Sequence, residues 1–142
     1  MQTTTTLANT QVVQDCYRLF KEGNKEGLLN LLADNVQWSV PGPREIPYAG
    51  NREGKAAVRE FFNLVDESEE VLKLEPREFI EQGNKVVACG YWESKVKKTG
   101  KTAKGDWAMV FTLKNGKIAR LQEYSDTNNT AEAFRSGKSS RN

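Results

Sequence analysis

The chain of 142 residues contains no histidine, only two cysteines and no glycine-rich phosphate loop. Without histidine, it can form neither a Ser-His-Asp nor a Cys-His nucleophile system, and it cannot ligate zinc or iron through imidazole. Cys16 and Cys89 are too far apart in the sequence to make a metal site together, and no G-x-G-x-x-G or Walker pattern occurs. We therefore expect no metal and no cofactor, so any chemistry must use carboxylates, Tyr, Lys, Arg or Cys.

Long apolar runs are missing too, and no stretch approaches the ~18–20 residues that span a bilayer. The first ten residues lack the basic and apolar regions of a secretory signal. The 21 basic residues nearly balance the 19 acidic ones, and a net charge of +2 is too small to indicate a nucleic-acid or membrane surface. A domain of this length needs no disulfide, so the two cysteines fit free, buried thiols in a reducing compartment. These features predict a soluble, cytoplasmic protein.

The length is typical of one domain, which we assign to residues 1–142 with a core at about residues 10–134. We expect disorder in the polar start before Thr10 and in the basic tail from Gly137 onward. Apolar residues recur at helical spacing in three early segments and in one late segment. The helices predicted in this way cover residues 10–21, 25–33, 54–66 and 128–134, with Thr10 as N-cap of the first and Asp126 or Thr127 as N-cap of the last.

Strand signals dominate the second half of the chain. The predicted strands cover residues 36–40, 71–81, 85–97, 101–113 and 117–126. Pro76 indicates an edge strand or a bulge, and Asn115-Gly116 is a strong hairpin signal. We expect an irregular loop over residues 44–51 and a solvated loop over the acidic run 66–70, because like charges are unfavourable at a helix C-terminus. Helices gathered ahead of hairpin-paired strands predict an α+β fold with the helices on one face of a curved sheet.

Several segments resemble the SnoaL-like and ketosteroid-isomerase-like families, which share the cone-shaped α+β fold of nuclear transport factor two. Residues 12–35, VVQDCYRLFKEGNKEGLLNLLADN, are similar to the isomerase pattern without a gap. The segments similar to the SnoaL-like pattern are residues 40–43, 47–50, 54–58, 107–113, 116–118 and 123–127. The resemblance implies three N-terminal helices on a strongly curved, mostly antiparallel sheet that encloses a mostly apolar pocket. It also implies a homodimer formed through the outer face of the sheet.

The resemblance further indicates where catalytic residues are expected, and most of those positions hold other chemistry. The isomerase tyrosine falls on Cys16, its base aspartate on Val40, and its second acid on Met109 or Ala108. We therefore expect no steroid isomerisation. The carboxylate of the SnoaL-like cyclases falls on Glu123, whereas their polar residue on the neighbouring strand falls on Met109.

Strand alternation places Glu123 on the more apolar face of its strand, together with Ala119, Leu121 and Ser125. Two interpretations remain open for this side chain. In one, Glu123 pairs with an Arg or Lys near the rim of the pocket. In the other it has a catalytic or ligand-orienting role, and burial raises its pKa towards the range that suits general acid–base work.

The candidate ligand-binding residues are those expected around an internal pocket, most of them apolar or aromatic. They are Cys16, Phe20, Trp38, Val40, Tyr48, Phe61, Trp107, Met109, Phe111 and Leu121. The large side chains among them equally suit a plain core. Tyr48, in a loop bounded by prolines, is a candidate lid, and Cys16 is expected to be an inert buried thiol.

Three functions remain open at this point. The first is a cofactor-free enzyme of the isomerase, cyclase or hydratase type that acts through Glu123 on an apolar, carbonyl-bearing molecule. The second is a protein that binds such a molecule without chemistry, and the third is a module for dimerisation or docking. The expected partners are a small hydrophobic molecule and a second copy of the chain, but neither nucleic acid nor a membrane. The dimer face is expected to carry Tyr124 and either Tyr91 or Trp92.

Overall fold

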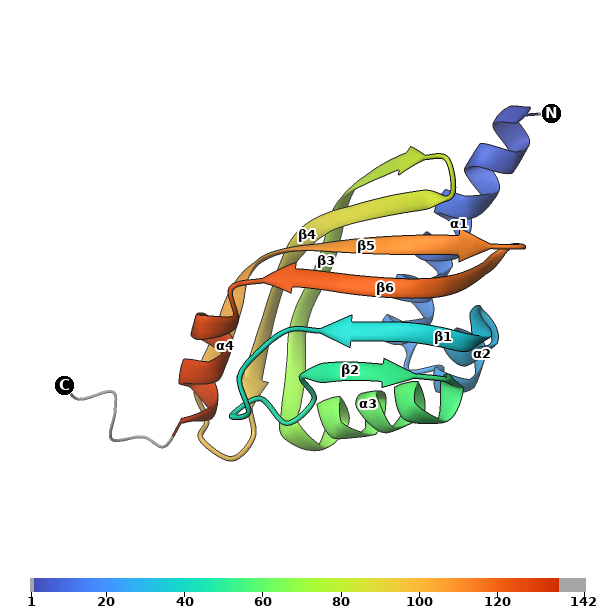
Figure 1. Ribbon diagram of the computed structural model, residues 1–142. Coiled ribbons are helices and arrows are strands. Elements are labelled where there is room, and N and C mark those ends of the chain that lie inside the picture. The colour runs from blue at the N-terminus through green and yellow to red at the C-terminus, as the bar shows by residue number, and fades with distance from the viewer. Residues whose placement is uncertain (1, 136–142) are drawn as a thin grey trace.

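The computed structural model describes residues 2–135, with side chains from Ala8 onward. The described helices are α1 (Gln2–Glu22), α2 (Lys25–Asn30), α3 (Lys55–Ser68) and α4 (Thr127–Phe134). The described strands are β1 (Leu32–Val40), β2 (Gly50–Glu53), β3 (Glu69–Gln82), β4 (Lys85–Val96), β5 (Thr102–Lys114) and β6 (Lys117–Ser125). They form one strongly curved sheet in the order β2-β1-β6-β5-β4-β3 (Figure 1).

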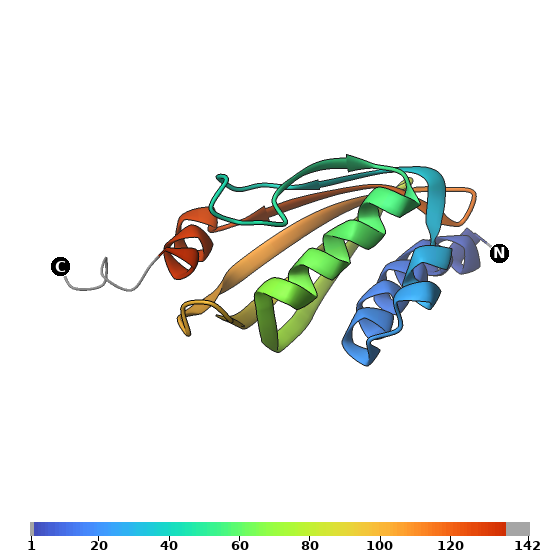
Figure 2. The ribbon, with the colours of Figure 1, turned by 90° about the horizontal axis from the view of Figure 1, so that it is seen from below.

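The helices α1, α2 and α3 lie on the same side of this sheet, as Figure 2 shows, while α4 follows β6 at one end of the sheet. Neighbouring strands pair antiparallel except β1 and β6, which are parallel. The predicted α+β fold, with three N-terminal helices on a curved and mostly antiparallel sheet, is confirmed. None of the described helices has the length and apolarity that a membrane crossing requires.

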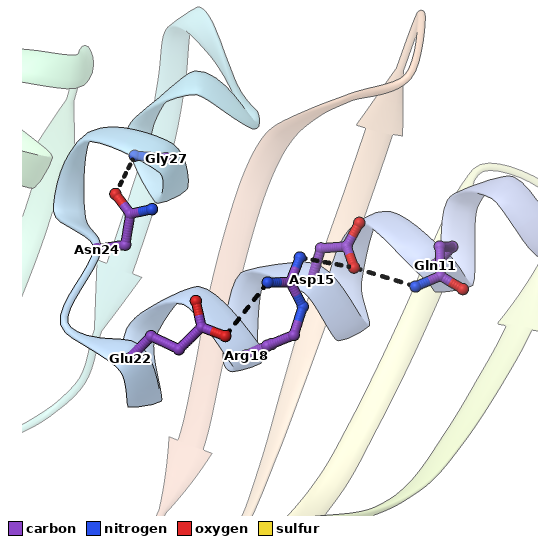
Figure 3. A network of polar contacts seen from close by, with 6 residues as sticks. All are labelled: Gln11, Asp15, Arg18, Glu22, Asn24 and Gly27. Carbon is purple, nitrogen blue, oxygen red and sulfur yellow. Dashed lines mark hydrogen bonds and ion pairs between the residues drawn. The ribbon is translucent and has the colours of Figure 1, made fainter.

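The helix α1 is amphipathic, and its two faces have different roles. Val13, Cys16 and Tyr17 are buried against the sheet. Figure 3 shows polar contacts on its exposed side and at the start of α2, where Asn24 accepts a hydrogen bond from the backbone of Gly27. The contacts along α1 join Gln11 to Asp15, and Arg18 to both Asp15 and Glu22. Exposed pairs of this kind stabilise a helix by only a few tenths of a kcal/mol, at about 0.2–0.5 each, so the buried face holds α1 on the sheet.

The predicted start of the first helix and the predicted end of the second are wrong. The helix α1 begins at Gln2, so residues expected to be disordered are helical, and no Gly or Pro interrupts the run up to Glu22. Thr10 does not cap it, because the Thr10 backbone N–H and hydroxyl donate to the Glu81 carboxylate on β3. The strand β1 begins at Leu32, inside the predicted second helix, because a short run of leucines fits a helix and a buried strand equally well. The tail from Gly137 lies outside the described residues.

Of the two loop predictions, the irregular loop expected over residues 44–51 is confirmed as far as residue 49, and its last two residues belong to β2. The loop expected over the acidic run 66–70 is wrong, because this run ends α3 and begins β3. The turn and edge signals are confirmed. Pro76 lies in the edge strand β3, beside a shift in register. Asn115 and Gly116 both have positive φ, 53° and 78°, as a tight hairpin turn requires.

The alternation of β4 settles which of its aromatic residues faces outward. Trp92 points to the inner face, whereas Tyr91 lies on the outer face with the Arg77 guanidinium 5.1 Å above its ring. Tyr124 is 57% exposed on the same outer face. Cys89 shares the outward phase of Tyr91, so it is half-buried rather than buried. The homodimer expected through this face stays a prediction.

Candidate functional site

A partly enclosed cavity of about 130 Å³ lies between the inner face of the sheet and the helices α1 and α3. Its wall is mostly apolar and includes all three tryptophans of the chain, Trp38, Trp92 and Trp107. A cavity of about 150 Å³ accommodates benzene, so the enclosed space has room for about one ring. Aromatic walls with few polar groups are typical of sites for small hydrophobic molecules.

The structure brings the residues predicted from sequence together around this one cavity. Those on its wall are Cys16, Phe20, Trp38, Val40, Tyr48, Phe61, Trp107, Met109, Phe111, Leu121 and Glu123. That they bind a ligand stays a prediction. Burial raises the pKa of the Cys16 thiol to about 12, which fits the inert thiol expected there.

Tyr17 also lines the cavity, although the sequence analysis did not place it there. Successive helix residues point ~100° apart, and both Cys16 and Tyr17 fall on the buried half of α1. The Tyr17 hydroxyl donates a hydrogen bond to the Met109 Sδ at 2.9 Å. Its ring stacks on Trp107, with 5.3 Å between the ring centroids. A phenol therefore does lie near the position where the isomerase resemblance called for one, but its proton is directed at a sulfur atom.

Glu123 projects from β6 into the cavity. Its Oε2 accepts a hydrogen bond from the Ser125 hydroxyl at 3.0 Å. Among the described residues no Lys or Arg forms an ion pair with it, so the interpretation as a paired rim residue is wrong. Burial raises the pKa of Glu123 from 4.5 to about 7; the Ser125 hydrogen bond opposes this shift and the nearby charge of Glu69 adds to it.

A second carboxyl, Glu69, lines the same cavity, and the sequence analysis missed it. Glu69 is the first residue of β3 and is only 5% exposed. Burial raises its pKa, while the nearby hydroxyls of Tyr48 and Ser94 act in the opposite direction. Neither the Glu69 Oε1 nor the Ser94 Oγ has a partner of normal hydrogen-bond geometry among the described residues. The inward alternation of Glu69 with Val71 is a signal for this placement, but the surrounding acidic run hides it.

Tyr48 reaches the cavity from the loop between β1 and β2. Its ring packs edge-on against Phe61 and Phe134, at centroid distances of 5.8 and 6.1 Å. Burial raises the pKa of Tyr48, and the charges of Glu69 and Glu123 raise it further. The phenol therefore stays protonated and lies in the electrostatic field of both carboxyls.

Two further polar groups on the cavity wall have no hydrogen-bond partner among the described residues. The indole N–H groups of Trp38 and Trp107 are buried and have no acceptor among the described residues. Buried donors normally find a partner. In the described part of the chain, no cluster of three or more acidic or cysteine side chains is arranged to hold a metal ion. The polar chemistry of the site therefore consists of two carboxyls, a few hydroxyls and two indole donors.

This fold and this cavity define a cone-shaped α+β domain with an internal, aromatic pocket. The sequence model of the SnoaL-like domain matches residues 13–121, so the chain belongs to the SnoaL-like family. No curated protein matches the chain.

Three solved structures show how far the similarity extends. An NTF2-like protein from Burkholderia xenovorans LB400 is 34% identical, with a TM-score of 0.84 over 92% of this chain and 98% of that one. An NTF2-like protein of unknown function from Burkholderia pseudomallei K96243 is 26% identical, with a TM-score of 0.82 over 91% and 98%. TerC, co-crystallized with polyporic acid, is 28% identical, with a TM-score of 0.75 over 89% and 98%.

Proposed function

We propose that this SnoaL-like protein binds a small hydrophobic, carbonyl-bearing molecule in its cavity and moves a proton to or from that molecule at Glu123 without a cofactor. The observation that carries the proposal is the state of Glu123. Its carboxyl lies in an apolar, aromatic cavity, burial raises its pKa to about 7, and no described Lys or Arg forms an ion pair with it. A group that titrates near neutral pH is suited to both donating and accepting a proton.

The chemistry follows from the two protonation states of this carboxyl. The neutral acid donates a hydrogen bond to a carbonyl oxygen, and the anion accepts a proton from the carbon next to the carbonyl. Isomerisation, cyclisation and dehydration of carbonyl compounds all use such a transfer. TerC, at 28% identity, was co-crystallized with polyporic acid, which supports a small-molecule ligand for a fold of this kind.

The alternative is a protein that binds the same class of molecule without turnover. The position of the isomerase base holds Val40 and that of its second acid holds Met109 or Ala108, and none of these side chains can transfer a proton. Under this alternative, Glu123 and the unused indole donors orient the ligand through hydrogen bonds. Catalysis and binding then differ only in whether the Glu123 proton leaves its carboxyl.

The experiment uses cyclohexanone, a one-ring ketone with exchangeable hydrogens next to its carbonyl, and cyclohexane as the hydrocarbon of the same shape. Binding is measured by quenching of tryptophan fluorescence, since all three tryptophans line the cavity. Turnover is measured by proton NMR as exchange of the ketone's α hydrogens in heavy water. We expect the ketone to bind more tightly than cyclohexane and to exchange faster than in buffer.

Glu123→Gln separates the two functions, because the amide keeps the shape of the side chain but cannot titrate. For the enzyme, the variant loses the accelerated exchange while binding the ketone within about tenfold, or ~1.4 kcal/mol. Glu78→Gln, at an exposed carboxyl on β3, is the matched control and leaves both measurements unchanged. Binding without exchange by the unmodified protein favours the alternative, and equal binding of ketone and hydrocarbon refutes carbonyl recognition.

A further inference from the structure

We infer that Glu69 is a second catalytic residue of this cavity, the base that takes a proton from the carbon next to the ligand's carbonyl while Glu123 gives its own proton to the carbonyl oxygen. The inference rests on the proposed function and assigns one direction of proton movement to each carboxyl. It also defines the reaction class as enolisation, the step shared by isomerisation and dehydration of carbonyl compounds.

The geometry places the two carboxyls on separate walls of one cavity. Glu123 belongs to β6 and Glu69 to β3, and the strands β5 and β4 lie between these two in the sheet. The sheet between them is strongly curved (Figure 1), and both side chains line the cavity on its inner side. A molecule that fills a space of about 130 Å³ therefore contacts both walls at once.

No ion pair or hydrogen bond of normal geometry among the described residues accounts for the burial of Glu69. It is 5% exposed, and its Oε1 makes no hydrogen bond to any described residue. Burying a carboxyl without full hydrogen bonding costs free energy. A ligand that brings a proton or a donor to this oxygen removes that cost.

Among the described residues no Lys or Arg forms an ion pair with either carboxyl, although Glu69 also borders a surface groove that Lys21, Lys73 and Lys97 line. The titratable groups that share the described cavity wall with the two carboxyls are Tyr17, Tyr48 and Cys16, and no Lys or Arg belongs to that wall. The Arg52 guanidinium lies 5.5 Å from the ring centroid of Phe61, but it donates to the backbone oxygen of Tyr48 at 2.7 Å. Two carboxylates in one apolar cavity repel each other, so the state with one proton between them is favoured over the doubly charged state.

Hydroxyl donors decide which carboxyl keeps the shared proton. Glu69 interacts with the hydroxyls of Tyr48 and Ser94, whereas Glu123 receives a hydrogen bond from Ser125 alone among the described side chains. Hydrogen bonds to a carboxylate favour its charged form. Glu69 is therefore the anion and Glu123 the neutral acid, which matches the assignment of base and acid.

The step is balanced without any further reactant. The C–H bond next to the carbonyl breaks, its proton passes to Glu69, and its electron pair forms the carbon–carbon double bond of the enol. The carbonyl oxygen takes the proton of Glu123, so Glu69 ends neutral and Glu123 ends charged. Return of the Glu69 proton to a carbon atom, and of the enol proton to Glu123, restores both groups.

The test measures exchange of the α hydrogens of cyclohexanone in heavy water by Glu69→Gln. We expect the exchange rate to fall by more than about 100-fold, the lower end of what a general base contributes, while tryptophan quenching shows binding within about tenfold. Glu67→Gln makes the same change two residues earlier, at an exposed side chain of α3, and keeps the unmodified rate. If the Glu69→Gln variant still exchanges the hydrogens at the unmodified rate, the inference is overturned and the proposed function stands. If the unmodified protein does not accelerate exchange, both are overturned.

Carbon NMR of labelled glutamate side chains tests the pair without turnover. Glu69→Gln removes a like charge from the cavity, so the pKa of Glu123 must fall, and an unchanged Glu123 titration overturns the inference. Tyr48→Phe keeps the test possible if Glu69→Gln does not fold. Loss of the Tyr48 hydroxyl destabilises the Glu69 anion and so raises the pKa of Glu69. The exchange rate, which rises with pH as Glu69 ionises, must then rise at a higher pH than in the unmodified protein. A rise at the same pH contradicts the inference.

Discussion

Glu123→Gln is expected to remove a pH dependence of stability that a buried, unpaired carboxyl creates. In the folded protein the pKa of Glu123 is raised from 4.5 to about 7, whereas the unfolded chain returns it to its ordinary value. Between these two values the folded state holds a proton that the unfolded state has released. The free energy of unfolding therefore decreases as the pH rises from 4.5 towards 7, and the loss is complete above pH 7.

The size of this loss follows from the same two values. At ~1.4 kcal/mol for each pKa unit, the ionised Glu123 destabilises the folded protein by about 3 kcal/mol above pH 7. Gln is neutral at every pH and avoids this cost. The variant should therefore be close to the unmodified protein near pH 4.5 and up to about 3 kcal/mol more stable at pH 8, with relief of repulsion at Glu69 acting in the same direction.

Urea unfolding followed by tryptophan fluorescence at a series of pH values between 4.5 and 8 measures this difference. Glu78→Gln serves as the control, since an exposed carboxyl of β3 is hydrated in both states and should give a curve parallel to that of the unmodified protein. If the curves of the unmodified protein and Glu123→Gln also stay parallel over the whole range, Glu123 ionises as readily in the folded state as in the unfolded state. The argument from burial is then refuted, and the proposed acid–base role loses its basis.

Three further predictions concern packing, capping and assembly. Gly90→Ala should lower the thermal stability by about 1–3 kcal/mol, because a methyl group there meets the Trp107 ring at 2.6 Å and the Glu75 backbone oxygen even more closely. Asp126→Ala should cost about 1 kcal/mol in chemical unfolding, since its side chain accepts the Asn129 backbone N–H at the start of α4. Light scattering at micromolar concentration should give about twice the chain mass of 16.0 kDa, whereas a monomer would contradict the expected homodimer.

The parts of the fold that the sequence predicts are those determined by local chemistry. Asn115 and Gly116 adopt the positive φ that defines their turn, and Pro76 lies in an edge strand, because both effects act within a few residues. The parallel pairing of β1 with β6 joins segments far apart in the chain, so no local pattern reports it. The run from Leu28 to Leu32 is divided between a helix and a strand by tertiary packing, which short-range periodicity does not encode.

In the candidate site, too, local sequence patterns predict some features, whereas others depend on the assembled fold. Alternation along one strand was sufficient to place Glu123 on the inner face, because a strand that has one apolar face fixes its own phase. For Glu69 the alternation with Val71 is too short to fix the phase, since the neighbours Glu67 and Glu70 have the same chemistry as Glu69 and are exposed. Its burial depends on where α3 stops and β3 begins, which is a property of the assembled fold. The lack of a cation near Glu123 was equally hidden, because 21 basic residues offered many possible partners.

The cost of the two buried carboxyls argues for a function inside the cavity rather than on the surface. An ionised Glu123 lowers the stability by about 3 kcal/mol above pH 7, and Glu69 adds a buried oxygen without a hydrogen bond. An apolar side chain at either position removes the cost and fills the core equally well. Proteins give up stability of this size at sites that bind or transform a ligand. A docking module gains nothing from acids that its partner never meets, so the interior of the cone is where the function of this chain is to be sought.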